Sequence, residues 1–311
     1  MKLLVAYDGS SCSEAALDDL VKAGLPDEGE ALVTSIAEVW LPPPNGNGNP
    51  SGIKLDPYYE NLIEKHYERG KNAIAEAETF ANHAKKRLKK ILPHWKIKAE
   101  ATYGSPAMEI IMRADNFHPD LIVVGSHGRS AVNRFILGSI SQKVLTEAEC
   151  SVRVARGRIE IDPTPTRLIV AFDGSKGALA AVEAVSKRYC RGNSEVRLLG
   201  VTDPTAPSAI GRFISPITHM VEEINRSERK WLEKLAENAL VTLRGTGLTA
   251  SLHIHEGNPK QVLAEEAERW NADCIFVGAN AFGSKLERFL LGSTSAAVAA
   301  RASCSVEVVR K

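Results

Sequence analysis

The sequence predicts an α/β protein that consists of two similar domains, each a five-stranded parallel sheet sandwiched by helices. The first observation is an internal repeat, because Lys2–Ser10 returns as Arg167–Ser175 and Cys150–Val154 returns as Cys304–Val308. The second is that short apolar runs alternate with longer helical stretches, which favours a parallel sheet with right-handed crossovers and helices on both faces. The third is that these runs are almost purely aliphatic, as expected for strands buried on both sides.

The repeat divides the chain into two domains of unequal length. Matching residues lie 165 positions apart at Asp8 and Asp173 but only 154 apart at the final strands, so the middle of the first copy is longer. The first copy also carries an insert at 41–52, rich in Pro, Gly and Asn, which is either a lid over a ligand or a disordered surface loop. We assign residues 1–156 to the first domain, 157–166 to a linker and 167–311 to the second domain.

Local patterns predict the elements of the first domain in order. Apolar residues between Ile74 and Ile91 recur with the 3.6-residue period of an amphipathic helix. Ser11 and Glu14 form a capping box at the start of the first helix, and Pro106 stands at the first position of a later one. We predict strands at Leu3–Tyr7, Ala31–Ala37, Lys96–Thr102, Leu121–Val124 and Ser151–Ala155, and helices near Ser13–Ala23, Tyr58–Ile91, Ala107–Asn116 and Ser139–Glu147.

The second domain repeats this order of elements. Gly257-Asn-Pro259 corresponds to Gly104-Ser-Pro106 and again predicts a turn from a strand into a helix, with proline at the first helical position. The predicted strands lie near Leu168–Phe172, Glu195–Val201, Thr249–His255, Cys274–Val277 and Ser305–Val309.

Composition and charge exclude several classes of protein. The net charge of +1 gives no reason to expect nucleic acid or an anionic membrane as a partner. The longest aliphatic runs, such as Leu121–Val124, are far shorter than the roughly 18 residues of a membrane span. The first residues lack the pattern of a secretory signal, and the 5 cysteines include no C-x-x-C pair, which fits reduced thiols and neither a disulfide framework nor a zinc site. We therefore expect a cytoplasmic protein.

Candidate binding residues gather where the predicted strands end, because ligands of an open parallel sheet bind beyond the carboxyl ends of its strands. Asp8 closes the first strand, where its carboxylate can bond a ribose hydroxyl, help to hold Mg²⁺, or cap the following turn. Gly125-Ser-His-Gly128 follows the fourth strand, and its backbone N–H groups can turn inward to bind an anion. Gly138-Ser139 then opens a helix, whose N-terminus suits phosphate.

The arrangement Gly125-x2-Gly128-x9-Gly138-Ser139, with Asp8 ending the first strand, resembles the ATP-binding members of the universal stress protein family. The resemblance covers both halves and implies a tandem protein that binds ATP, with Mg²⁺ carried by the nucleotide near Asp8 and no metal held by the protein alone. It also implies that the main chain at Ile36 reads adenine and that the glycines hold the triphosphate. The implied binding residues are Ala6, Tyr7, Asp8, Ile36, Gly125, Ser126, His127, Gly128, Arg129, Gly138, Ser139, Ile140 and Ser141. For Arg129, a solvated surface side chain is the alternative.

The second domain departs from this pattern. Gly278 and Gly283 are separated by four residues where the first domain has two, and Phe282 adds bulk at the mouth of the loop. We expect ATP in the first domain and leave open whether the second domain binds nucleotide. Its candidate binding residues are Asp173, Val201, Gly278, Gly283, Gly292, Ser293 and Thr294.

The last strand of each copy, Cys-Ser-Val-x-Val, would leave a sheet edge of the kind that proteins cover or pair. Members of the resembled family dimerise through this strand, which implies that the two copies form a pseudo-twofold pair within one chain. We expect this internal pseudo-dimer, with further homodimerisation left open, and a salt bridge at the interface that involves Arg134 and Arg288.

The sequence favours a binding module over an enzyme. His127 is the best candidate for a proton shuttle, but the sequence places no second residue to orient it, and the P-loop pattern is absent. The leading hypothesis is a stress-response protein whose ATP occupancy is sensed by an unknown protein partner, with at most slow ATP hydrolysis. Two alternatives stay open. One is a nucleotidyl transferase or ATP pyrophosphatase-like enzyme, whose signatures near the first strand are missing, and the other is a structural stress protein that binds no nucleotide.

Overall fold

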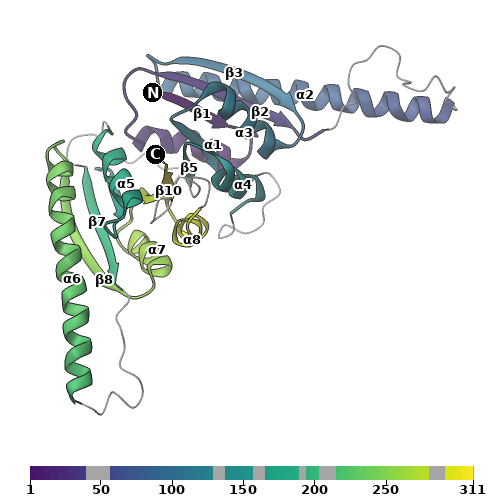
Figure 1. Cartoon of the computed structure of the whole chain (residues 1–311). Coiled ribbons are helices and arrows are strands. Elements are labelled where there is room, and N and C mark those ends of the chain that lie inside the picture. The colour runs from purple at the N-terminus through teal and green to yellow at the C-terminus, as the bar shows by residue number, and fades with distance from the viewer. Residues whose placement is uncertain are drawn as a thin grey trace.

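A computed structural model describes residues 1–39, 57–128, 137–156, 165–188, 194–202, 215–279 and 291–310. The insert at 41–52, most of the predicted linker, and Arg134 and Arg288 lie outside the described residues. The described chain forms two halves with the same order of strands and helices (Figure 1).

The predicted elements of both halves are present. The first half contains β1 (Lys2–Ala6), α1 (Ser11–Asp19), the 3₁₀ turn η1 (Leu20–Lys22), β2 (Glu30–Ala37), α2 (Pro57–Ile91), β3 (Lys96–Tyr103), α3 (Pro106–Phe117), β4 (Leu121–Gly125), α4 (Ser139–Glu147) and β5 (Ser151–Ala155). The second half contains β6 (Arg167–Ala171), α5 (Lys176–Ser186), β7 (Glu195–Thr202), α6 (Ser215–Arg244), β8 (Thr249–Glu256), α7 (Pro259–Arg269), β9 (Cys274–Gly278), α8 (Ser293–Arg301) and β10 (Ser305–Val309).

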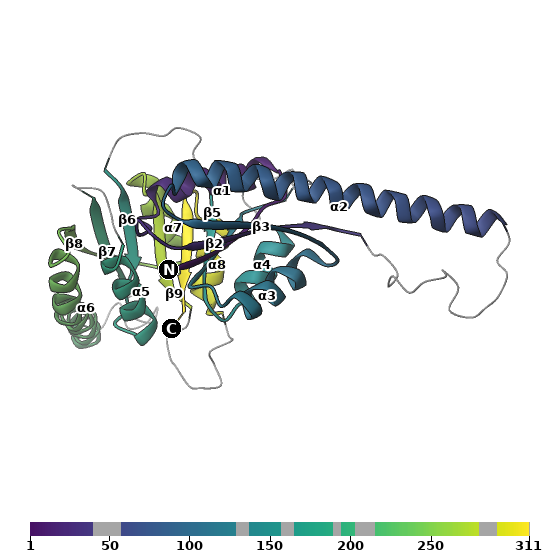
Figure 2. The ribbon, with the colours of Figure 1, turned by 90° about the horizontal axis from the view of Figure 1, so that it is seen from above.

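The strands of the described residues form one 10-stranded sheet in the order β3-β2-β1-β4-β5-β10-β9-β6-β7-β8. Neighbouring strands within each half are parallel. The halves meet where β5 and β10 pair antiparallel (Figure 2). The predicted pseudo-twofold pair of five-stranded sheets is therefore confirmed. The edge strand β5 of the first half pairs with the edge strand β10 of the second.

The junction between the halves is apolar on one face of the sheet. Val152 and Val154 of β5 belong to the same buried cluster as Val306 and Val308 of β10. Because side chains alternate between the two faces of a strand, the opposite face carries separate clusters, one in each half. The halves thus share one hydrophobic core, and burial of this core opposes their separation.

Two long helices are the most extended parts of the fold. The helix α2 has 35 residues and packs against β2 and β3, while α6 has 30 residues and packs against β7 and β8. Figure 1 shows both helices running well beyond the strands that they cover. None of the described helices is long and apolar enough to cross a membrane.

The predicted capping box at the first helix is wrong by one residue. The N-cap is Ser10, whose hydroxyl oxygen accepts a hydrogen bond from Ser13 N at 3.1 Å. Because α1 begins at Ser11, Glu14 is one residue too far along the helix to reach back to the cap. Its carboxylate instead accepts hydrogen bonds from Tyr7 and Arg87.

Candidate functional site

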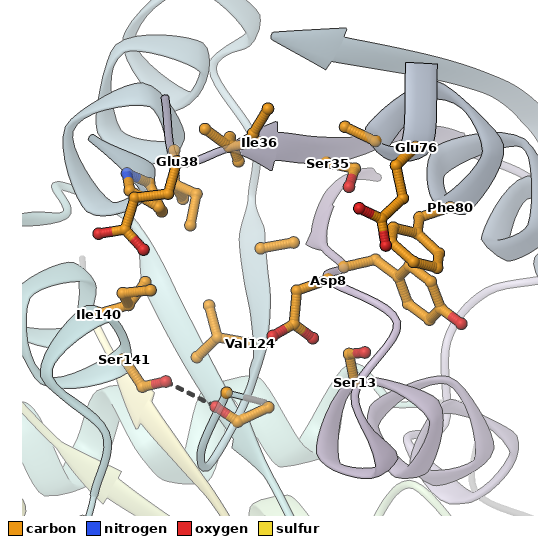
Figure 3. Close-up of a pocket in the computed structure, with 18 of the residues that line it drawn as sticks. Asp8, Ser13, Ser35, Ile36, Glu38, Glu76, Phe80, Val124, Ile140 and Ser141 are labelled. Atoms are coloured by element: carbon orange, nitrogen blue, oxygen red, sulfur yellow. Dashed lines mark hydrogen bonds between the residues drawn. The ribbon is translucent and has the colours of Figure 1, made fainter. Parts of the chain in front are cut away.

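A cavity of about 430 Å³ lies in the first half, beyond the carboxyl ends of β1, β2 and β4 (Figure 3). The N-terminal parts of α1, α3 and α4 and one side of α2 complete its wall. Its size falls within the range of about 300–1,000 Å³ that is typical of small-molecule sites. Its place is that expected of a ligand site in an open parallel sheet.

Asp8 lies in this cavity directly after β1, and Figure 3 shows its carboxylate pointing inward. Its Oδ1 accepts a hydrogen bond from Ser10 N at 3.0 Å, which holds the turn between β1 and α1. Its Oδ2 lies 3.3 Å from the position that a Cβ on Gly128 would occupy. The carboxylate therefore holds the turn and also faces the glycine loop after β4, so the two roles that the sequence left open are compatible.

The glycines of the loop meet different demands. A Cβ on Gly125 would lie 2.9 Å from the carbonyl carbon of Cys12, so this glycine lets β4 approach the start of α1. Gly138 N donates to Ser126 O at 2.8 Å, and a Cβ on Gly138 would lie 3.3 Å from that same oxygen. Close backbone packing therefore explains Gly125 and Gly138, while at Gly128 a side chain would crowd the Asp8 carboxylate.

The first turn of α4 forms the floor of the cavity. Its N-cap is Gly138, so no side-chain hydrogen bond occupies the N–H groups of the first turn. The Ser141 hydroxyl donates to Gly125 O at 2.6 Å and ties this turn to the end of β4 (Figure 3). A helix start that is held in place and faces a cavity suits an anion.

His127 lines the cavity and is only 9% exposed. Its Nδ1 lies 3.1 Å from Ser126 Oγ, whereas its buried Nε2 has no hydrogen-bond partner among the residues that the structure describes. Burial lowers the pKa of His127, and the nearby Arg156 cation lowers it further, which favours a neutral imidazole. A buried ring nitrogen without a partner is costly, so a ligand that bonds Nε2 would relieve this cost.

Tyr7 connects the cavity wall to a polar cluster behind it. Its hydroxyl donates to the Glu14 carboxylate, and Arg87 and His83 contact the same carboxylate. Burial raises the pKa of Tyr7 well above its usual range, and the bond to Glu14 adds to this effect. Tyr7 therefore stays a neutral hydrogen-bond donor, and its hydroxyl is bonded to Glu14 behind the cavity wall.

The cavity wall is acidic. Of the described residues that line it, Asp8, Glu38 and Glu76 are carboxylic acids and none is Lys or Arg. The described residues contain no group of three or more His, Cys, Asp or Glu side chains that could hold a metal ion.

The structure brings most of the predicted site residues of the first half together. The lining includes the predicted residues Ala6, Tyr7, Asp8, Ile36, Gly125, His127, Gly128, Ile140 and Ser141. Ser126, Gly138 and Ser139 stand next to them, outside the lining, and Arg129 lies outside the described residues.

Sequence reasoning missed the wall that α2 supplies. Ala73, Glu76, Ala77 and Phe80 line the cavity and recur with a spacing of three or four residues on one helix face. That spacing was visible in the sequence for Ala77 and Phe80, but it indicated a core-facing stripe. Also missed were Ser13, Ser35, Ala37, Glu38, Val39, Pro106, Ile110 and Val124.

The second half reproduces much of the hydrogen bonding of the site. The Ser295 hydroxyl donates to Gly278 O at 2.6 Å, as the Ser141 hydroxyl does to its own strand end. Asp173 accepts a hydrogen bond at 2.9 Å from the N–H two residues further on, as Asp8 does. The strand ends and the helix start are therefore arranged alike in both halves.

The predicted residues of the second half lie on equivalent elements. Gly292 is the N-cap of α8, whose first two residues are Ser293 and Thr294. Val201 lies in β7 and packs against the shared core. Gly283 and Phe282 lie outside the described residues. Whether these residues bind a ligand stays a prediction.

The helices α2 and α6 can be aligned through the glycines that they cover. A Cβ on Gly9 would lie 2.7 Å from Phe80 Cε1, and a Cβ on Gly174 would lie 2.4 Å from Leu235 Cδ1. Both glycines have a φ of 76°, and they hold the same place in the repeat. Phe80 and Leu235 are therefore equivalent, and so are the residues three positions earlier in each helix.

This alignment reveals a difference between the halves. Ala77 and Ser35 line the cavity of the first half, and their equivalents are Leu232 and Gly200. Leu232 is only 4% exposed, and its Cδ2 lies 2.5 Å from the position of a Cβ on Gly200. A leucine side chain therefore fills space in the second half that the first half leaves open beside Ala77.

Fold and site define a tandem α/β protein with a ligand-sized cavity at the strand ends of its first half. The chain belongs to the universal stress protein family, which matches residues 1–156 and 165–310. A universal stress protein of Mycobacterium tuberculosis is 24% identical over 318 residues, which cover 99% of this chain and 97% of that protein. Universal stress protein YxiE of Bacillus subtilis is 33% identical over 164 residues, which cover 50% of this chain and 98% of YxiE.

The tandem arrangement also has a structural counterpart. The crystal structure of a universal stress protein from Archaeoglobus fulgidus matches with a TM-score of 0.58 and 21% identity. The match covers 100% of this chain and 96% of that one. The similarity shows that a fold like that of the whole chain occurs in another universal stress protein.

Proposed function

We propose that the first half binds ATP together with Mg²⁺, and that the chain acts in a stress response as a nucleotide-dependent sensor or interaction module. One observation carries the proposal. A carboxylate, an imidazole nitrogen without a partner among the described residues, a glycine beside that carboxylate and a helix N-terminus converge on one cavity at the strand ends. Such a set of groups suits a nucleotide, which offers hydroxyls and phosphates at neighbouring positions.

The proposed roles follow from where each group lies. The phosphates would meet the N-terminus of α4 and the backbone beside Gly128, where no Cβ intrudes. Asp8 would bond the ribose or a Mg²⁺ ion carried by the phosphates. Adenine would lie against Ile36 at the end of β2, where the main chain would read it.

A sensor suits the geometry better than an efficient ATPase. The neutral His127 has one ring nitrogen beside Ser126, and its other ring nitrogen has no partner within the described part of the chain, so it can bond a phosphate oxygen. Ser126 gives His127 an orienting contact that the sequence did not predict, and slow hydrolysis is therefore the second candidate activity. Rapid turnover, abolished in His127→Ala, would contradict the sensor proposal and favour an enzyme.

The proposed stoichiometry is one nucleotide per chain. In the second half, Leu232 fills space at the strand ends, whereas in the first half the smaller Ala77 leaves the equivalent space open. The two sites therefore offer different volumes to a ligand. A second half that resembles the first but does not bind nucleotide would act mainly as its fixed partner across the β5–β10 pair.

The first experiment is to denature the freshly purified full chain and to identify any released nucleotide by mass spectrometry. Calorimetry with added ATP and Mg²⁺ then follows on nucleotide-free protein. About one ATP per chain supports the proposal, and two per chain would contradict the role given to Leu232. Failure to find nucleotide, followed by no binding of added ATP, would leave a two-domain scaffold and refute the proposed function.

A further inference from the structure

Each half ends in an arginine that contacts a helix of the other half. Arg310 follows β10, and its Nη2 donates to Leu145 O at 2.5 Å, in the last turn of α4. Arg156 follows β5, and its Nη2 donates to Ala300 O of α8 at 3.0 Å. The two arginines hold equivalent places in the repeat, so the contacts are reciprocal across the pseudo-twofold axis.

The backbone places Arg310 firmly beside the first half. Arg310 N donates to Ser151 Oγ at 3.1 Å, at the start of β5. Arg156 N makes the equivalent bond to Ser305 Oγ at 2.9 Å. Arg310 thus leaves the β5–β10 junction from a fixed point and reaches the end of α4 with its side chain.

The helix that Arg310 holds is the one that opens into the cavity. Ile140 and Ser141, in the first turn of α4, line the cavity, while Leu145 is in its last turn and is fully buried. The helix has 9 residues, so its two ends are only about 13 Å apart at 1.5 Å per residue. A cation at the C-terminal carbonyls satisfies an unpaired acceptor and complements the helix dipole.

We propose that Arg310, from the second half, is a positioning residue for the phosphate end of the nucleotide site in the first half. The inference rests on the proposed function. Arg310 holds the last turn of α4, and the position of this short helix sets where its N-terminal N–H groups meet the phosphates. By linkage, a nucleotide that binds these groups strengthens the contact between the halves by the same free energy.

The test compares ATP and adenosine binding to the full chain by calorimetry in Mg²⁺. Arg310→Met should weaken ATP binding roughly two- to fivefold, the scale of a helix-terminus interaction, and leave adenosine affinity unchanged. Arg310→Lys should restore much of the ATP affinity, because it keeps a cation near the same carbonyl. The matched control is Arg244→Met, because Arg244 donates to Ala250 O at 2.8 Å entirely within the second half.

Each outcome has a separate meaning. If the unaltered chain binds neither ATP nor adenosine, the proposed function itself fails. If it binds both and Arg310→Met changes neither affinity, the positioning role is refuted. Equal weakening of ATP and adenosine, or the same loss in Arg244→Met, would show general destabilisation and would also overturn the role of Arg310.

Discussion

Arg153 and Glu307 face each other across the antiparallel β5–β10 pair, at the junction of the two halves. Arg153 Nη1 lies 3.2 Å from Glu307 Oε2, and both side chains are 1% exposed. Asp19 and Arg188 complete the buried network, since Asp19 binds Arg153 and Arg188 binds Glu307. The two residues hold the same place in the repeat, so a pair of two first halves would set arginine against arginine.

The first prediction concerns this junction. Glu307→Gln should lower the free energy of unfolding by roughly 3–5 kcal/mol, because it leaves buried guanidinium groups without their full counter-charge. Chemical denaturation of the full chain measures the change. Glu183→Gln is the control, since Glu183 forms an exposed pair with Lys187 and should cost less than about 1 kcal/mol. An equal decrease in the free energy of unfolding of the two variants would contradict the stabilising role of Glu307.

The second prediction assigns the nucleotide to the first half. Asp8→Asn should weaken ATP binding by about 10-fold or more, because hydrogen bonds to a charged group contribute about 1.5–3 kcal/mol. The asparagine oxygen can still accept from Ser10 N, so the turn is preserved. Asp173→Asn makes the same change in the second half and should leave the affinity unaltered. If calorimetry shows that Asp173→Asn weakens ATP binding and Asp8→Asn does not, the nucleotide binds in the second half.

The third prediction concerns Mg²⁺. Asp8 lies in the cavity, where its carboxylate could bind a Mg²⁺ ion that the phosphates of ATP carry. ATP binding in excess EDTA should be at least roughly tenfold weaker than in Mg²⁺, whereas adenosine binding should not change. An ATP affinity that is independent of Mg²⁺ would contradict the proposed role of the ion.

The fourth prediction uses the difference between the halves. Ala77→Leu copies Leu232 into α2 and places a larger side chain beside Ser35, inside the cavity. We expect it to abolish detectable ATP binding, with less than about 3 kcal/mol of lost stability, the usual cost of overpacking. Leu232→Ala should leave the affinity of the first half intact. Full ATP binding by Ala77→Leu would show that the nucleotide lies elsewhere.

The fifth prediction concerns pH. Because the pKa of His127 is lowered in the folded protein, the unfolded chain binds more protons as the pH falls below about 6.5. The contribution of the neutral His127 to the free energy of unfolding is fully present above that pH. It is lost as the pH falls through the lowered pKa of the folded protein. His127→Asn should therefore flatten the fall in melting temperature between about pH 7 and pH 5. Parallel curves for the two proteins would contradict a buried neutral His127.

Local signals in the sequence were sufficient for most of the fold. The bounds of β5, α4 and β10 match the predicted ones, because glycine turns and aliphatic runs mark them within a few residues. Capping was harder to predict, since Ser10, Ser11 and Ser13 can each cap a helix and only the backbone path selects Ser10. The salt bridge predicted at the interface is not tested, because Arg134 and Arg288 lie outside the described residues.

The sequence by itself determined that the chain is a tandem repeat, that each copy is a parallel α/β sheet, and that Asp8 and the glycine loop share one edge. These features depend on neighbouring residues or on the repeat, which can be read along the chain. Only the tertiary structure decided that α2 walls the cavity, that Leu232 fills the equivalent space, and that Arg310 holds α4. Such contacts join residues far apart in sequence, and packing in three dimensions determines them.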